Sequence, residues 1–72
     1  MYFEFCDTKK NITDLVSCED IVHVDISLIS GENYNIKLVY AYGVTINIMT
    51  VQHQKNNFIR TLVFYKNNGH IN

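Results

Sequence analysis

A chain of 72 residues with a formal net charge of −1 has room for one small domain and lacks the strongly basic balance typical of nucleic-acid-binding proteins. Two cysteines are too few for a disulfide framework, and no apolar run approaches the length of a membrane span. The N-terminal residues show no basic region followed by an apolar run and a cleavage site. We therefore expect one cytoplasmic domain, residues 1–72, with Cys6 and Cys18 reduced and half-buried.

The N-terminal third contains one segment that clearly predicts a strand and one that fits either a helix or a loop. Residues 2–6, YFEFC, predict a strand with Phe3 and Phe5 on one face, and the DTKKN segment after it favours a turn. In residues 12–18, Ile12, Leu15 and Val16 stand at helical spacing, with Thr13 as an N-cap. This spacing predicts one or two turns of helix, and a loop is the alternative.

Residues 21–30, IVHVDISLIS, predict a strand because apolar and polar residues alternate. One face carries Val22, Val24, Ile26 and Leu28, and the other carries His23, Asp25 and Ser27. The SGEN segment that follows predicts a turn, in which Gly31 or Asn33 takes a positive φ.

The segment 34–48, YNIKLVYAYGVTINI, keeps its apolar residues at even positions across Gly43. A two-residue hairpin turn would shift the apolar set to odd positions, so it does not fit. Two structures do fit: one long strand bent at Gly43, or two strands joined by the three-residue loop Ala41-Tyr42-Gly43, with Tyr42 exposed at its tip. We favour the bent strand, because an Ala-Tyr-Gly loop is unusually apolar.

The C-terminal part is interpreted as mostly extended. Met49 and Val51 shift the apolar set to odd positions, and QHQKNN at 52–57 is a polar connection. Residues 58–66 have apolar side chains at both parities, which indicates an interior strand or one whose outer face meets a second subunit. We expect residues 67–72 to be a frayed tail. The predicted fold is mainly β, α+β at most, with a single small antiparallel sheet of four to five curved strands and one short helix near residues 12–18.

The near-neutral net charge hides an asymmetry along the chain. All seven acidic residues lie in residues 1–32, which carry a formal charge of −5 because only two lysines accompany them. Residues 33–72 contain no acidic residue and carry a formal charge of +4. Such separation gives a bipolar surface, unless strand pairing interleaves the two halves and cancels the field.

The chemistry-bearing residues do not form a catalytic or metal-binding motif. The cysteines and histidines lack the close spacing of metal ligands, Cys18 lies at the end rather than the start of its predicted helix, and the three glycines are isolated. A thin sheet also offers little volume for a cleft. We therefore expect no enzyme, no catalytic residue, no metal and no cofactor.

Protein binding suits this composition best. Tyrosine contributes large contact area at low entropy cost, and the Asn-, Ile-, Tyr- and Lys-rich composition is typical of AT-rich coding in phages and mobile elements. The sequence therefore predicts a small non-enzymatic protein-binding module of a phage or mobile element, acting as a steric inhibitor of a host defence complex. The predicted protein-binding residues are Glu19, Asp20, Asp25, Glu32 and Tyr42, and we expect a homodimer formed through a sheet edge or the outer face of residues 58–65.

The alternative is a small β-barrel-like protein that binds nucleic acid. Its candidate contacts are the basic residues Lys37, Lys55, Arg60 and Lys66, accompanied by tyrosines. The order of a strand, the SGEN turn, a long strand and a further strand pair is loosely similar to Sm-like and OB barrels. The Sm-type Asp/Asn signature is absent, so the resemblance implies no family membership.

Overall fold

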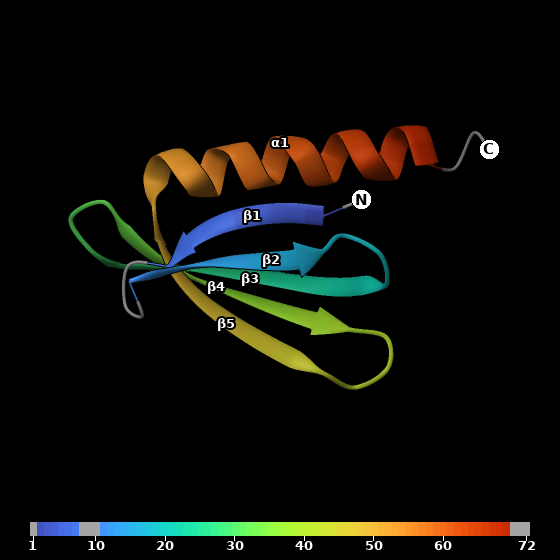
Figure 1. Cartoon of the computed structure of the whole chain (residues 1–72), viewed down its shortest axis with the longest axis horizontal. Helices are drawn as coiled ribbons and strands as arrows, with labels where there is room; N and C mark the ends of the chain where they lie inside the picture. Colours follow the sequence, from blue (N-terminus) through green and yellow to red (C-terminus); the bar gives the residue numbers. More distant parts are fainter. Residues whose placement is uncertain (1, 8–10, 70–72) are drawn as a thin grey trace.

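The computed structural model describes residues 2–7 and 11–69, which form five strands and one helix (Figure 1). Strands β1 (Tyr2–Asp7) and β2 (Ile12–Ser17) pair in a two-stranded antiparallel sheet. Strands β3 (Ile21–Ser30), β4 (Asn33–Tyr40) and β5 (Thr45–Val51) form a three-stranded antiparallel sheet in that order, and helix α1 (Gln52–Gly69) follows. The prediction of a mainly β, antiparallel fold is confirmed, although the strands form two sheets rather than one.

The helix predicted near residues 12–18 is wrong, because this segment is strand β2. Phe3 lies opposite Val16 and Phe5 opposite Asp14, so every residue of β2 has a partner on β1. A helix of one or two turns is unstable by itself, whereas the adjacent strand supplies backbone partners along the whole segment. The turn before β2 is closed by the Asn11 N–H, which donates to the Asp7 carbonyl at 2.8 Å.

Residues 34–48 form a hairpin, so the favoured bent strand is wrong and the three-residue loop is confirmed. The Tyr40 N–H donates to the Val44 carbonyl at 2.9 Å, and the Gly43 N–H donates to the Tyr40 carbonyl at 3.0 Å. Gly43 has φ +88°, a conformation that glycine adopts without steric cost. Tyr42 stands exposed at the tip of the loop, as this alternative requires.

The strand predicted at residues 21–30 is confirmed as β3, although its apolar residues Val22, Ile26 and Leu28 are exposed, and its pairing with β4 is interrupted near each end. The register shifts between Ile21 and His23 and again between Leu28 and Ser30, which leaves Val22 and Ile29 as bulged residues. Gly31, at φ +55°, occupies the turn to β4, as the sequence predicts.

The strand predicted at residues 58–66 is wrong, because these residues lie within helix α1. The polar connection at 52–57 forms the first turns of the same helix, and residues 67–69 of the predicted tail form its end. Residues 70–72 lie outside the described residues. In the helix, Phe58 and Leu62 face the core one turn apart, and Ile59 and Val63 lie on the exposed side. The apolar residues at both even and odd positions therefore lie on the inner and outer sides of one helix, and not on the two faces of a strand.

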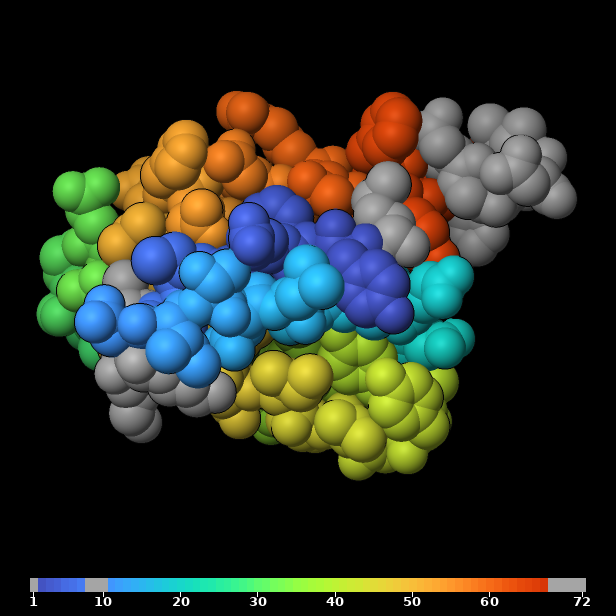
Figure 2. Space-filling view, in the orientation of Figure 1, coloured from blue at the N-terminus to red at the C-terminus, as the bar shows by residue number. Residues whose placement is uncertain are grey.

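The core lies where α1 crosses the strands. The helix contacts β1, β4 and β5 and runs along one side of the molecule with β1 next to it (Figures 1 and 2). Phe58 packs its ring 5.3 Å from Phe3 and 4.9 Å from Phe5, between centroids. The buried apolar cluster consists of Phe5, Val16, Ile21, Ile36, Leu38, Tyr40, Ile48 and Phe58.

Side-chain hydrogen bonds connect β1 to the rest of the chain. The Thr50 hydroxyl of β5 donates to the Cys6 carbonyl at 3.2 Å, and the Cys6 N–H donates to Gln54 Oε1 of α1 at 3.2 Å. Both cysteines are free thiols, but neither is half-buried as expected, since Cys6 is exposed and Cys18 is buried.

Candidate functional site

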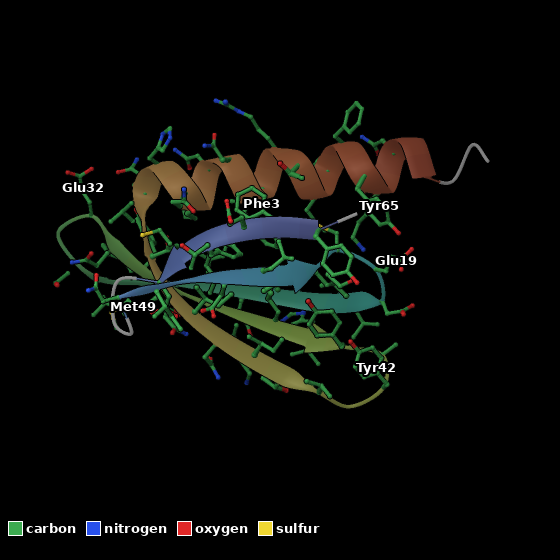
Figure 3. The ribbon with its side chains drawn as sticks, in the orientation of Figure 1. Phe3, Glu19, Glu32, Tyr42, Met49 and Tyr65 are labelled. Carbon is green, nitrogen blue, oxygen red and sulfur yellow. The ribbon has the colours of Figure 1, made fainter. Side chains whose placement is uncertain are left out.

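Three separate segments meet at one end of the molecule. They are the β2–β3 turn at residues 18–20, the β4–β5 loop at residues 41–44 and the last turns of α1. Figure 3 shows Glu19 and Tyr65 close together at this end, with Tyr42 on the same side. We call the surface formed by Glu19, Asp20, Tyr42 and Tyr65 the acidic–tyrosine end.

A backbone hydrogen bond fixes the two loops of this end against each other. The Ala41 N–H donates to the Asp20 carbonyl at 2.8 Å, which ties the β4–β5 loop to the β2–β3 turn. Asp20 itself has φ +64°, a left-handed conformation that aspartate tolerates better than most residues. The Ser17 Oγ accepts a hydrogen bond from the Glu19 N–H at 3.1 Å, so both acidic residues stand on a defined turn.

The buried Tyr40 supports the exposed Tyr42. Its hydroxyl donates to the Ser17 carbonyl at 2.6 Å, and its ring centroid lies 5.4 Å from that of Tyr42. The helix is joined to the same region by Lys66, whose Nζ donates to the Ile21 carbonyl at 3.2 Å. The exposed side chains of the acidic–tyrosine end therefore rest on an ordered base.

Burial and negative charge suppress ionisation around this end. Burial raises the pKa of the Cys18 thiol. Burial also raises the pKa of Tyr40, with smaller contributions from Tyr42 and Cys18. Loss of solvent contact raises the pKa of Tyr65 as well, and the negative charges of Glu19 and Asp20 raise it further. Tyr40 and Tyr65 are thus neutral hydrogen-bonding groups at neutral pH.

Replacing Tyr40 by phenylalanine should lower the free energy of unfolding by about 1 kcal/mol, because the Ser17 carbonyl loses its donor. The folded-state pKa of Tyr40 lies above the ordinary value of about 10, so the unfolded chain loses this proton first. The stabilisation is complete below pH ~10 and disappears as the pH rises through the folded-state pKa. Urea denaturation should therefore show a steeper loss of stability above pH ~10 in the wild type than in Tyr40→Phe.

Tyr42→Phe is the matched control, since it keeps the Tyr40 hydroxyl and removes an exposed one. It should retain most of the wild-type pH dependence, because burial is the largest cause of the raised pKa of Tyr40 and Tyr42 contributes less. An equally steep alkaline loss of stability in Tyr40→Phe would contradict the assigned role of the Tyr40 hydroxyl.

The structure brings together only part of the predicted protein-binding set. Glu19, Asp20 and Tyr42 lie at the acidic–tyrosine end, whereas Glu32 lies at the opposite end of the molecule (Figure 3). Asp25 lies on the outer face of the three-stranded sheet, where its Oδ1 is 2.9 Å from His23 Nε2. Tyr65 is not among the predicted protein-binding residues, because the sequence does not show that residues 58–66 end beside the β2–β3 turn.

The alternative basic set is spread over the molecule. Lys37 lies on the outer face of the three-stranded sheet, opposite Asp25, and Lys55 holds its Nζ 4.5 Å from the centroid of the Tyr34 ring. Lys66 donates to the Ile21 carbonyl, and Arg60 is exposed on α1. Lys37 comes from β4 and the other three from α1, where Lys55 and Lys66 are engaged at separate places, on the Tyr34 ring and on the Ile21 carbonyl, so the four do not form a continuous basic groove.

The charge separation along the chain is partly kept in the fold. Strands β1 and β2, both from the acidic part of the chain, pair with each other, and α1 comes entirely from the basic part. The two parts interleave at β3 and β4, where Asp25 stands opposite Lys37. Lys66 of α1 also bonds to the Ile21 carbonyl beside the β2–β3 turn, so its charge offsets part of the negative charge of Glu19 and Asp20.

Within residues 2–7 and 11–69, no three side chains of histidine, cysteine, aspartate or glutamate are grouped as metal ligands would be. Over the same residues, no helix has both the length and the apolar content needed to cross a membrane. Comparisons with protein-family models, curated proteins and solved structures found no match for this chain.

Proposed function

We propose that the protein is a small non-enzymatic binding module whose acidic–tyrosine end docks on a basic patch of a larger protein. The observation that carries this proposal is the convergence of Glu19, Asp20, Tyr42 and Tyr65 from three elements on one hydrogen-bonded base. The proposal rests on chemistry and placement together: the acidic side chains set the charge of the partner, and the tyrosines supply the contact area.

Preorganisation supports affinity at this surface. A loop that is already fixed before binding loses less conformational freedom when the partner arrives. The bond between Ala41 and Asp20 and the packing of Tyr42 on Tyr40 provide such order. Tyrosine rings bury large area and keep a polar tip, which makes them frequent centres of binding energy.

The proposed mechanism is steric inhibition in the cytoplasm of a host cell. A rigid domain of this size that covers a basic functional patch, such as one that contacts nucleic acid, excludes the normal ligand without catalysis. The composition bias supports an origin in a phage or mobile element, and a host defence complex is the proposed target.

Quantitative affinity purification from the host cell tests this proposal. The tagged wild type should retain one host complex, and Tyr42→Ala combined with Glu19→Lys should reduce its recovery at least about tenfold, because truncation of a central tyrosine commonly costs more than 1.4 kcal/mol. Glu32→Lys changes the charge equally at the opposite end and should retain the complex.

Two outcomes would contradict the proposal. Equal loss of the complex in Glu32→Lys would place binding elsewhere or make it a nonspecific charge effect. Recovery of nucleic acid instead, falling steeply with salt and lost when Lys55 and Arg60 become glutamate, would support the alternative function.

A further inference from the structure

Strand β3 is the most exposed strand in the described part of the chain. Only Ile21 is buried and Val24 half-buried, while the remaining eight residues of β3 are exposed. Four of those exposed residues are apolar: Val22, Ile26, Leu28 and Ile29. Among the described strands, β3 pairs with β4 alone, so its other side is a sheet edge. A long, exposed and apolar edge strand is a template for pairing with another strand.

The direction of the backbone groups on this edge follows from the β4–β5 hairpin. The N–H and C=O of Tyr40 both bond within that hairpin, so they point toward β5 and away from β3. At the other end of β4, the carbonyl of Glu32 accepts a hydrogen bond from the Gln52 N–H. Glu32 is also an even-numbered residue, so its carbonyl, like the backbone groups of Tyr40, points away from β3. Because backbone groups alternate along an antiparallel strand, the odd residues of β4 point toward β3.

The partners of those odd residues are His23, Asp25 and Ser27, so the N–H and C=O groups of these three residues are hydrogen-bonded to β4. The intervening residues Val24, Ile26 and Leu28 direct their N–H and C=O groups to the outer edge. The bulges at Val22 and Ile29 bound this regular stretch on both sides. The free edge thus presents three donors and three acceptors in one uninterrupted run.

We propose that this edge pairs with the same edge of a second copy, antiparallel about a two-fold axis at Ile26. In this register Val24 stands opposite Leu28 of the partner subunit, Ile26 stands opposite the partner's Ile26, and all six outward backbone groups of each copy are bonded. The two three-stranded sheets join into one six-stranded sheet. The open apolar side chains of Ile26 and Leu28 then gain apolar neighbours across the axis.

Electrostatics select this register over its neighbours. Only the even residues direct their backbone groups to the outer edge, so an even residue of one copy must stand opposite an even residue of the other. The register can therefore move only in steps that keep this pairing. The step to one side places Asp25 opposite the partner's Asp25, where two carboxylates repel. The step to the other side centres on Ser27 and leaves Val24 opposite Ser30 of the partner subunit, beyond the bulge at Ile29. With Ile26 on the axis, each Asp25 carboxylate faces a serine hydroxyl, Ser27 of the partner subunit, which can donate to it.

A cysteine scan across the axis tests the register. In a Cys6→Ser background, the variants Asp25→Cys, Ile26→Cys and Ser27→Cys are oxidised under mild conditions and the covalent dimer is measured. Directly opposite residues in such a pair have Cα atoms about 5.5 Å apart, within disulfide range, whereas diagonal residues are about 7–8 Å apart. Ile26→Cys should form dimer at least about tenfold faster than either neighbour. Faster linkage at Asp25 or Ser27 would overturn the register.

Sedimentation of the native chain over a range of concentrations tests the association itself. The wild type should show a dimer, and Ile26→Pro should be monomeric, because proline removes an N–H that faces the edge and none that bonds β4. Ile26→Lys is a second variant with the same expected loss, should the proline disturb folding. A wild type that stays monomeric, or a dimer that survives both variants but is lost in Val63→Lys on α1, would overturn the proposal. This experiment does not involve the acidic–tyrosine end, so its failure is distinct from failure of the proposed function.

Discussion

Phe58→Ala should lower the free energy of unfolding by about 3–5 kcal/mol, the usual cost of removing a buried phenylalanine ring. Phe58 is fully buried and packs against both Phe3 and Phe5, so its ring joins α1 to the first sheet. Domains of this size have about 3–5 kcal/mol of stability in total. We therefore expect the variant to be largely unfolded at room temperature, as measured by circular dichroism and urea denaturation.

Val63→Ala on the same helix is the matched control. Val63 is 52% exposed, so its truncation creates no cavity, and alanine has the higher helix propensity. Its stability should stay within about 0.5 kcal/mol of the wild type. If Phe58→Ala were as stable as Val63→Ala, the placement of α1 over the strands would be wrong.

Alternation in the central strands made most of the sheet predictable. In β4, Ile36, Leu38 and Tyr40 are buried, and the intervening Lys37 and Val39 are not. A period of two over several residues is specific to a strand with one covered face, because no helix places even residues together. The same pattern also identified the three-residue loop as an allowed solution, although apolar composition argued against it.

The helix was missed because its outer side is apolar too. Ile59, Val63 and Phe64 are exposed beside Arg60 and Lys66, so the segment lacks the uniformly polar face that distinguishes an amphipathic helix from a buried strand. Strand β2 shows the reverse case. Ile12, Leu15 and Val16 stand at helical spacing by coincidence, and Leu15 points to solvent. The pairing of β2 with β1 and the packing of α1 on the strands determine the structure of these two segments. Local periodicity does not reveal such long-range contacts.

The acidic–tyrosine end was predicted in part. Charge identified Glu19, Asp20, Asp25 and Glu32 as a set, but charge alone does not say on which end or face each residue lies. The turn after β2 and the loop after β4 meet only because β3 and β4 pair with Ile21 opposite Tyr40. Tyr65 joined them only once its segment was known to be a helix that ends beside this turn.

Ile36→Ala should lower the free energy of unfolding by about 2–5 kcal/mol, because Ile36 is fully buried at the centre of the three-stranded sheet. Its neighbour Lys37 points to the opposite, exposed face, so Lys37→Ala should change stability by less than about 1 kcal/mol. Urea denaturation of both variants compares two adjacent positions that differ mainly in the face they occupy. A one-residue shift of register would reverse their order, since it moves every side chain of β4 to the other face. A larger effect at Lys37 than at Ile36 would therefore contradict the inward orientation of the even residues, on which the core depends.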